Sequence, residues 1–214
     1  MKTILICIQT LCGKISPAGF GSAKDRSILE KAREQTDATL LGAASLRAGD
    51  PEFRTSEGLL PEKRLRAIVT RSGNISPSKT MFQTGPRPLI FATQAKNASL
   101  KKKFGTRAEI ISVPESHSGM LLLPSVLDHL AKRGAKSCLI EGGGFLNHEA
   151  LRQCVVDELL ITIAPKIIGK DDEVSLVSGK EALGNPFLEL ELLACRPEAQ
   201  TDEIFLHYRV SRRK

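Results

Sequence analysis

The stretch Ser137-Cys138-Leu139-Ile140-Glu141-Gly142-Gly143-Gly144-Phe145-Leu146-Asn147 indicates how this chain folds. An apolar run over 137–140 leads into a carboxylate and three consecutive glycines, and a helical pattern follows over 145–154. Continuous apolar runs are typical of strands that are covered on both faces, as in parallel sheets. The succession of strand, glycine turn and helix predicts an α/β fold, with a ligand-binding loop at the carboxyl end of this strand.

The three glycines predict an anion site. Gly142, Gly143 and Gly144 allow a ligand to approach the backbone closely. The helix that starts there offers free N–H groups and the positive end of its dipole, which suits a pyrophosphate. The pattern is neither the GxGxxG fingerprint nor a P-loop. A simple tight turn between strand and helix is the alternative interpretation.

Glu141 is the carboxylate that the sequence places beside this loop. A charge at the end of an apolar strand is costly unless it is paired or faces a cleft. We therefore expect Glu141 to bind donor groups of a heterocycle or ribose. The alternative is that it only complements the positive end of the helix.

Short apolar runs alternate with helical patterns along the rest of the first two thirds of the chain. Ser22 and Asp25 resemble a capping box, which predicts a helix start. The run 4–8 ends at Gln9 without a cleavage-like site, so we interpret it as a buried strand and not as a secretion signal. The expected strands are 4–8, 39–41, 67–69, 89–91, 110–111 and 137–140, with a further helix over 124–134 and a polar loop over 49–64.

The pattern changes after Asp157, where apolar residues alternate with their neighbours. Leucines and isoleucines recur at every second position over 159–163, 188–192 and 204–210. Such alternation predicts antiparallel strands with one solvated face. The whole chain is thus expected to form one domain over 1–214. Its architecture would be a three-layer αβα fold with a mostly parallel sheet and antiparallel C-terminal strands.

Composition narrows the class of ligand. The formal net charge is +7 and the pI about 9.3, which favours anionic ligands. Aromatic residues make up only 4% with no Trp, so a protein that stacks nucleic-acid bases is not expected. We interpret 101–103 and 212–214, the two dense runs of cations, as solvated loop and tail charge. A non-enzymatic basic binding protein remains an alternative, supported by charge alone.

The five cysteines include no CxxC pair. They favour a reducing compartment, the cytoplasm, and give no metal site. No segment approaches the length of an apolar membrane span, so a membrane is not an expected partner. Nucleic acid is not an expected partner either, because aromatic residues are few.

Several segments, taken in order, resemble the C-terminal reductase domain of bifunctional riboflavin-biosynthesis proteins and its stand-alone relatives. That domain has a dihydrofolate-reductase-like fold. The resemblance covers nearly the whole chain and rests on the ordered set of motifs. The matching segments are Thr10 to Lys14, Arg33, Asp37-Ala38, Gly42-Ala43-Ala44-Ser45, Gly49-Asp50-Pro51, Val69-Thr70-Arg71-Ser72, Glu141-Gly142-Gly143, Val156-Asp157-Glu158-Leu159 and Ala164-Pro165.

The resemblance implies an NADPH-dependent oxidoreductase, usually a homodimer. It would reduce 5-amino-6-(5-phosphoribosylamino)uracil, or its 2,5-diamino-pyrimidinone counterpart, to the ribitylamino product of riboflavin biosynthesis. By family position, Glu141 would be catalytic, and the substrate would contact Lys14, Arg33, Phe53 and Glu141. The cofactor would contact Ser45, Ser72, Gly142, Gly143, Gly144, Phe145, Leu146 and Asn147.

The chain departs from the family pattern at several positions. Cys12 and Gly49 stand where the family has acids, and Arg71 replaces the Asp before Ser72. These departures leave two alternatives open: a reductase of the same fold that acts on a pterin such as dihydrofolate, or a catalytically weakened NADPH-binding paralogue. Arg71 itself is expected to meet the adenosine 2′-phosphate of NADPH.

Overall fold

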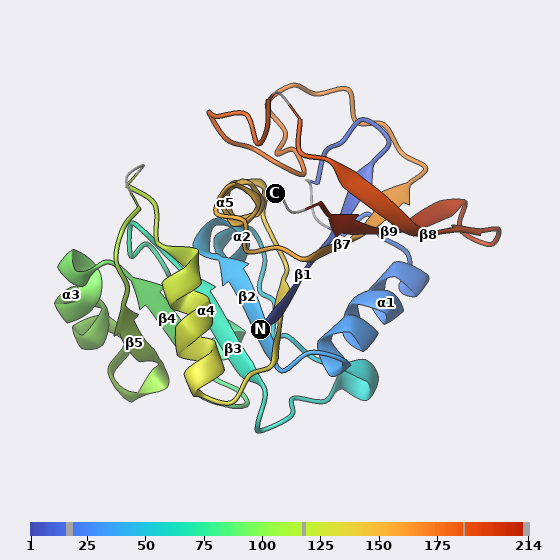
Figure 1. Cartoon of the computed structure of the whole chain (residues 1–214). Helices are drawn as coiled ribbons and strands as arrows, with labels where there is room; N and C mark the ends of the chain where they lie inside the picture. The colour runs from blue at the N-terminus through green and yellow to red at the C-terminus, as the bar shows by residue number, and fades with distance from the viewer. Residues whose placement is uncertain (16–18, 117–118, 186, 212–214) are drawn as a thin grey trace.

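A single nine-stranded sheet crosses the molecule in the order β5-β4-β3-β2-β6-β1-β7-β9-β8 (Figure 1). The computed structural model describes residues 1–15, 19–116, 119–185 and 187–211. All pairs from β5 to β7 are parallel, whereas β9 runs antiparallel to both β7 and β8. The predicted sheet, parallel with an antiparallel C-terminal part, is confirmed. The strands are Lys2–Thr10 (β1), Ala38–Gly42 (β2), Leu65–Val69 (β3), Leu89–Ala92 (β4), Glu109–Ser112 (β5), Ser137–Ile140 (β6), Glu158–Ala164 (β7), Leu190–Glu198 (β8) and Glu203–Val210 (β9).

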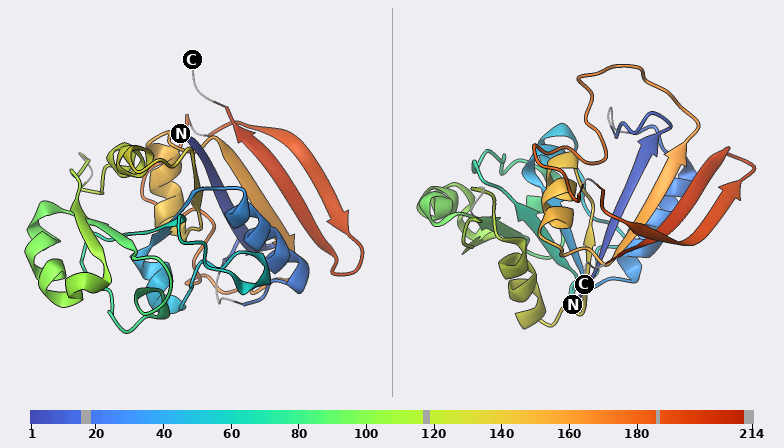
Figure 2. Two further views of the ribbon diagram at one scale, coloured as in Figure 1. Left: turned by 90° about the horizontal axis from the view of Figure 1, so that it is seen from below. Right: turned by 45° about the horizontal axis from the view of Figure 1, so that its top comes forward.

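Helices cover both faces of this sheet, which confirms the three-layer architecture (Figure 2). One face packs against α4 and α5 in the largest apolar cluster. The opposite face packs against α1 in one cluster and against α2 and α3 in another. The α-helices are Ala23–Glu34 (α1), Ala43–Ala48 (α2), Gln94–Phe104 (α3), Leu123–Lys132 (α4) and Gly144–Arg152 (α5), and short 3₁₀ turns occupy Ser56–Gly58, Thr80–Phe82 and Gly105–Arg107.

The central strands are apolar on both faces because helices cover both. Leu40 is 1% exposed and faces the α4 and α5 side, whereas its neighbour Leu41 is 4% exposed and faces the opposite side. This arrangement explains why β2 and β6 appear in the sequence as continuous apolar runs. Their carboxyl ends lie side by side, since Leu40 pairs with Ile140.

Two predictions of secondary structure were wrong. The cations at 101–103 lie in the last turn of α3 and not in a loop. Only Leu100 and Phe104 of this helix are buried, so its periodicity is weak in the sequence. The strand expected over 188–192 lies further along the chain: β8 begins at Leu190 and ends at Glu198, with a register shift between Leu192 and Ala194. The cations at 212–214 lie outside the described residues.

Only one of the two hydrogen bonds of the predicted capping box forms at the start of α1. The Ser22 hydroxyl accepts a hydrogen bond from the Asp25 backbone N–H at 3.1 Å. The reciprocal bond does not come from Asp25, because the Ser22 N–H donates to Glu203 Oε1 of β9 at 3.0 Å. The Asp25 carboxylate is therefore not used in the cap.

Within the described ranges, none of the helices combines the length and hydrophobicity that crossing a bilayer requires. All five cysteines are free thiols.

Candidate active site

A cavity of about 1220 Å³ opens at the carboxyl edge of the central strands. Its walls come from β1, the ends of β2, β3 and β6, and the helices α1, α2 and α5. Pockets for one drug-sized ligand measure about 300 to 1,000 Å³, so this cavity has room for two ligands side by side. Its position is where open α/β sheets bind ligands.

The glycine loop forms part of the cavity wall and is fixed by α2. The Gly143 N–H donates to the Ser45 hydroxyl at 2.8 Å, and the Gly42 N–H donates to the Gly142 carbonyl at 3.1 Å across a cis Gly142–Gly143 peptide. A Cβ at position 143 would lie 2.7 Å from Ser45 Oγ, so a side chain there would displace the Ser45 hydroxyl from its bond to the loop. The structure thus brings Ser45 and the loop together, as the sequence predicts.

The start of α5 provides the expected N–H groups. Its first backbone N–H groups have no acceptor within the helix. Phe145 is 64% exposed, whereas Leu146 and Asn147 are buried. Asn147 does not line the cavity; its amide donates to the Leu176 carbonyl at 2.8 Å. Gly143 and Gly144 remain as the side-chain-free wall that fits the phosphates of a dinucleotide.

The segment 174–181 lies over this helix start. The Ser178 N–H donates to the Gly144 carbonyl at 3.0 Å, and the Leu176 N–H donates to the Gly13 carbonyl at 3.0 Å. A Cβ on Gly144 would collide with the Ser175 carbonyl and lie 2.7 Å from Ser178 Oγ. The segment therefore packs tightly on the loop and lines the cavity beside it, a constraint that no local pattern in the sequence indicated.

Glu141 and Arg33 form a buried bidentate ion pair in the cavity wall. Arg33 Nε donates to Glu141 Oε1 at 2.7 Å and Nη2 donates to Oε2 at 2.6 Å. Their side chains are 7% and 4% exposed, respectively. The third guanidinium nitrogen donates to the Arg54 carbonyl at 2.7 Å, and the guanidinium lies 5.7 Å from the centre of the Phe53 ring. Three predicted substrate residues are thus in one cluster, although Phe53 is fully buried behind the wall.

This pairing alters the chemistry expected of both residues. Glu141 is compensated by a cation, which removes the cost of placing its charge at a strand end. The guanidinium fork of Arg33, expected to contact the substrate, is occupied by Glu141 instead. The pair presents lone pairs of an ionised carboxylate to the cavity, which suit N–H donors of a heterocycle.

Lys14 and Cys12 do not line the cavity as the structure describes it. The Lys14 ammonium donates to the carbonyls of Asp171 and Glu173, each at 3.0 Å. The Cys12 thiol is exposed and lies 3.2 Å from Thr10 Oγ1, and hydrogen bonds, first of all from Thr10, lower its pKa to about 7. A substrate role for Lys14 stays a prediction.

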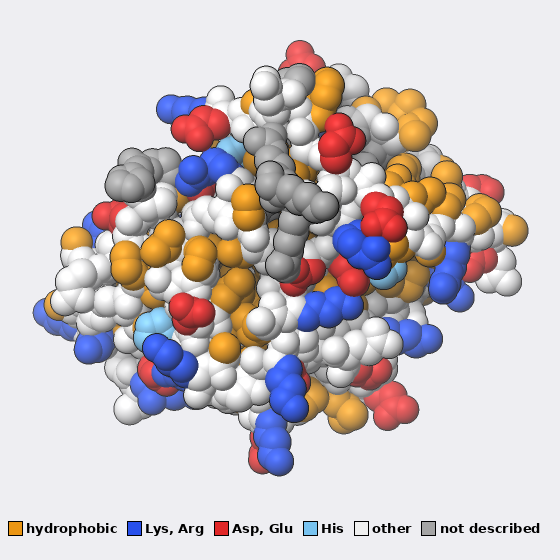
Figure 3. Space-filling view, viewed as in Figure 1, with side chains coloured by type: hydrophobic (Ala, Val, Ile, Leu, Met, Phe, Trp, Pro, Cys, Tyr) orange, Lys and Arg blue, Asp and Glu red, His pale blue; other side chains and the backbone are white. Residues whose placement is uncertain are grey.

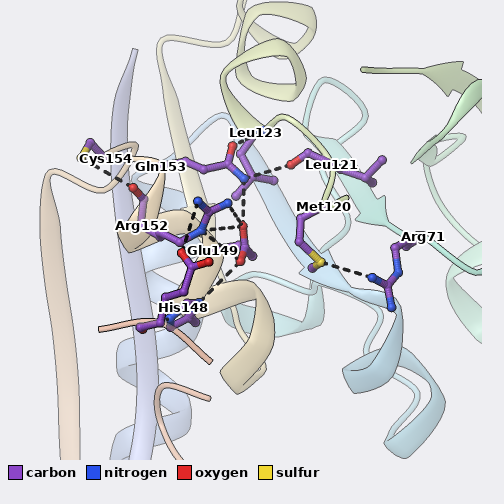
Figure 4. Close-up of polar contacts among 10 residues, drawn as sticks. Arg71, Met120, Leu121, Leu123, His148, Glu149, Arg152, Gln153 and Cys154 are labelled. Atoms are coloured by element: carbon purple, nitrogen blue, oxygen red, sulfur yellow. Dashed lines mark hydrogen bonds and ion pairs between the residues drawn. The ribbon is translucent and has the colours of Figure 1, made fainter. Parts of the chain in front are cut away.

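Ser72 and Arg71 lie on the far wall, after β3. Both line the cavity. The guanidinium of Arg71 has one described contact, Nη1 to Met120 Sδ at 3.7 Å (Figure 4). A thioether is a weak acceptor, so this guanidinium retains most of its capacity to donate to an anion.

The polar cluster on α5 that Figure 4 shows was not predicted from the sequence. Glu149 lines the cavity and accepts from Arg152 at 2.8 Å and from Gln153 at 3.1 Å. Burial acts to raise the pKa of Glu149, but these hydrogen bonds hold it below its usual value. The spacing of three and four residues on one helix is the signal that would have indicated this cluster.

Comparison with known proteins identifies related sequences. The sequence model of the RibD C-terminal domain family matches residues 2–200. A protein of Aquifex aeolicus named 2,5-diamino-6-ribosylamino-4(3H)-pyrimidinone 5′-phosphate reductase is 30% identical over 156 residues, covering 71% of this chain and 67% of that protein. A protein of the same name from Archaeoglobus fulgidus is 24% identical over 188 residues, covering 81% and 84%.

Solved structures share the fold. A pyrimidine reductase-like protein from Corynebacterium diphtheriae superposes with a TM-score of 0.80 at 24% identity, covering 99% of this chain and 92% of that one. Dihydrofolate reductase from Enterococcus faecalis, solved with NADP(H), gives a TM-score of 0.55 at 13% identity, covering 99% and 97%. The dihydrofolate-reductase-like fold expected from the motifs is therefore confirmed.

Proposed function

Because this chain belongs to the RibD C-terminal domain family, we propose that it reduces the ribosylamino group of a phosphorylated aminopyrimidine to a ribitylamino group, with NADPH as hydride donor. The relatives from Aquifex and Archaeoglobus are named for this reaction on the 2,5-diamino-pyrimidinone, which is one of the two substrates proposed here. The other is 5-amino-6-(5-phosphoribosylamino)uracil.

One observation carries the proposal: a single two-ligand cavity has an ionised carboxylate in one wall and a glycine-lined helix start in another. Gly143, Gly144 and Ser45 form the wall that fits the cofactor phosphates. Glu141 accepts hydrogen bonds from the pyrimidine, and Arg33 holds the carboxylate in place. When NADPH is bound it supplies the hydride, and the protein holds donor and acceptor together.

Apolar residues of the cavity exclude water around this polar pair. Ile6, Leu29 and Leu41 line the same cavity as Glu141 and the glycine loop. A dry wall strengthens the hydrogen bonds made by Glu141 and limits competing protonation by solvent. The substrate phosphate would be held by Lys14, because the guanidinium fork of Arg33 binds Glu141.

The test is to follow NADPH absorbance after adding each phosphoribosylamino-pyrimidine in turn, and then dihydrofolate. Oxidation with either pyrimidine supports the proposal, and the faster one identifies the substrate. Oxidation with dihydrofolate alone would make the chain a pterin reductase. Tight NADPH binding without oxidation of any of these would make it a catalytically weakened paralogue.

The proposal includes a homodimer formed by a single domain over 1–214, located in the cytoplasm. β8 is the outer strand of the sheet, and its Leu190 and Leu192 are 42% and 53% exposed. Apolar side chains gather over β8 and β9 at the right of Figure 3. An exposed apolar edge strand is a surface for pairing with a second copy. The free cysteines support a reducing compartment.

A further inference from the structure

Asp25 lines the same cavity as Glu141 and Arg33, a position that the capping-box interpretation did not predict. It lies in the first turn of α1 and shares one face of that helix with Leu29 and Arg33, at spacings of four residues. All three line the same cavity, with Arg33 binding Glu141. The helix therefore presents two chemically active side chains, Asp25 and Arg33, separated by an apolar one.

The Asp25 carboxylate is released from the helix cap by Glu203. A reciprocal capping bond would have tied it to the Ser22 N–H, but Glu203 Oε1 accepts from that N–H and Oε2 accepts from the Ser22 hydroxyl. Only the Asp25 backbone N–H takes part in the cap. The carboxylate is free to lie against the sheet.

The carboxylate lies in a confined and mostly apolar site. A Cβ on Gly21 would be 2.5 Å from Asp25 Oδ2 and 3.0 Å from Ile8 Cδ1, so the three are in contact. The Thr162 hydroxyl of β7 donates to it, and no ion pair to it occurs among the described residues. The neighbouring cation, Arg26, pairs with Glu30 at 3.3 Å.

These surroundings favour the neutral acid. Burial has the largest effect and raises the pKa of Asp25. The hydrogen bond from Thr162 comes next and acts against it, the charge of Glu203 raises the pKa further, and the charge of Arg26 has the smallest, lowering effect. The other titratable neighbour is Cys7, where burial raises the pKa to about 12, so that thiol stays neutral and holds its proton at neutral pH.

The other carboxylates in the described cavity wall are bound by cations or hydrogen-bond donors, or are largely exposed. Glu141 is bound by Arg33, and Glu149 by Arg152 and Gln153. Asp50 accepts from the Thr80 N–H and hydroxyl at 3.0 and 2.7 Å. Glu181 is 66% exposed and 3.9 Å from Arg152. Asp25 is thus the carboxyl group of this wall that is best able to carry a proton into the reaction.

We propose that Asp25 is the catalytic acid of the reduction. This inference rests on the proposed function. Its proton passes to the ribose ring oxygen as the bond between that oxygen and C1′ breaks, and the exocyclic nitrogen lone pair forms a C=N bond. Hydride from NADPH then adds to C1′, and the C=N electron pair returns to nitrogen. Asp25 ends as a carboxylate and regains its proton from solvent, so one hydride and one proton are consumed.

The test uses Asp25→Asn and Thr162→Val in steady-state assays across pH. Asn keeps the size of the side chain and cannot donate an acidic proton, so kcat is expected to fall about 100-fold with little change in KM or in NADPH binding. Wild-type kcat is expected to fall as pH rises through the pKa of Asp25, which gives the pH profile an alkaline limb. Asp25→Asn is expected to lack this limb. Thr162→Val removes a bond to the ionised form, so the limb moves to higher pH.

Asp25→Asn with wild-type kcat and an unchanged alkaline limb would overturn the assignment. If Asp25→Asn does not fold, the assignment is equally overturned when kcat of Thr162→Val falls at the same pH as kcat of the wild type. A wild-type chain that oxidises NADPH with neither pyrimidine overturns the proposed function together with this step. If the wild type oxidises NADPH with a pyrimidine and Asp25→Asn does so at the same rate, only the role of Asp25 is overturned.

Discussion

At the scale of single residues, the buried pair of Arg33 and Glu141 does two things at once. It compensates a charge at the end of an apolar strand, and it ties α1 to the glycine loop through two short hydrogen bonds. Breaking one partner of such a pair leaves the other charge buried and uncompensated. Stability and binding therefore depend on the same two side chains.

Glu141→Gln is expected to lower the free energy of unfolding by about 3 kcal/mol, because the Arg33 charge is left unpaired. Urea denaturation measures this, and NADPH oxidation is expected to fall in parallel as the heterocycle loses its acceptor. The control is Glu191→Gln, whose partner Arg209 and own side chain are 54% and 56% exposed. That change is expected to cost under about 1 kcal/mol. Equal losses in the two variants would contradict the role of the buried pair.

Asp25→Asn is expected to change how stability depends on pH. The raised pKa of Asp25 means that the folded state holds this proton more tightly than the unfolded state. Its contribution to stability is therefore present at low pH and is lost as pH rises through the raised pKa. The variant does not titrate, so its melting temperature relative to wild type is expected to be higher at pH 8 than at pH 4. A constant difference between the two chains would show that Asp25 is not held neutral.

Arg71→Ala is expected to reduce the preference for NADPH over NADH. The guanidinium lines the cavity, and its one hydrogen bond among the described residues is to the thioether of Met120. Its other N–H groups are therefore available to a 2′-phosphate. The KM for NADPH is expected to rise about tenfold, since a charge-assisted hydrogen bond contributes about 1.5 kcal/mol. The KM for NADH should stay the same and serves as the internal control. An unchanged ratio would remove this role from Arg71.

At the scale of elements, the glycine loop depends on the segment 174–181 that packs on it. The helix α5 starts at Gly144, where the packing of Ser175 and Ser178 leaves no room for a Cβ. Packing of two segments far apart in the chain thus shapes the wall that we assign to the cofactor.

Gly144→Ala is expected to destabilise the fold by about 1 to 3 kcal/mol, because the new methyl group collides with backbone that cannot move freely. The measurement is urea denaturation, together with NADPH binding, which is expected to weaken as the loop is displaced. Gly49→Ala is the matched control for stability: its Cβ would meet neighbours at 3.7 and 3.9 Å, ordinary contact distances. Two variants of equal stability would contradict the close packing.

At the scale of the whole molecule, the outer strand β8 leaves an apolar edge. Leu192 of β8 pairs with Tyr208 of β9, and both lie on the face that carries the largest apolar cluster. Glu191, Arg196 and Pro197 lie on the same strand, so the apolar part of this edge is the exposed pair Leu190 and Leu192.

Leu192→Lys is expected to shift the chain from dimer to monomer, because a charge would be buried in the proposed interface. Sedimentation velocity measures the shift. Leu59→Lys is the control, since Leu59 is 57% exposed in the loop that follows α2, away from β8. A wild type that sediments as a monomer at micromolar concentration would contradict the dimer.

The sequence determined the elements whose signal is local. Strand β6 begins and ends as predicted, and the helix after it begins one residue earlier than predicted, because a continuous apolar run and three glycines act through nearest neighbours. Helix α3 was missed, since only Leu100 and Phe104 contact the core. The ordered motifs also indicated the family and, through it, assigned Ser45 and Gly143 to the same ligand; the structure brings the two into contact.

Only the tertiary structure decided what each charged side chain binds. Arg33 and Glu141 are far apart in the chain, and their pairing depends on how α1 crosses the sheet. Glu203 takes the capping bond of Ser22 from a strand near the C-terminus, which leaves Asp25 to the cavity. Charges act through space and not along the chain, so a pattern of neighbours identifies the side chains that can carry chemistry but not their partners.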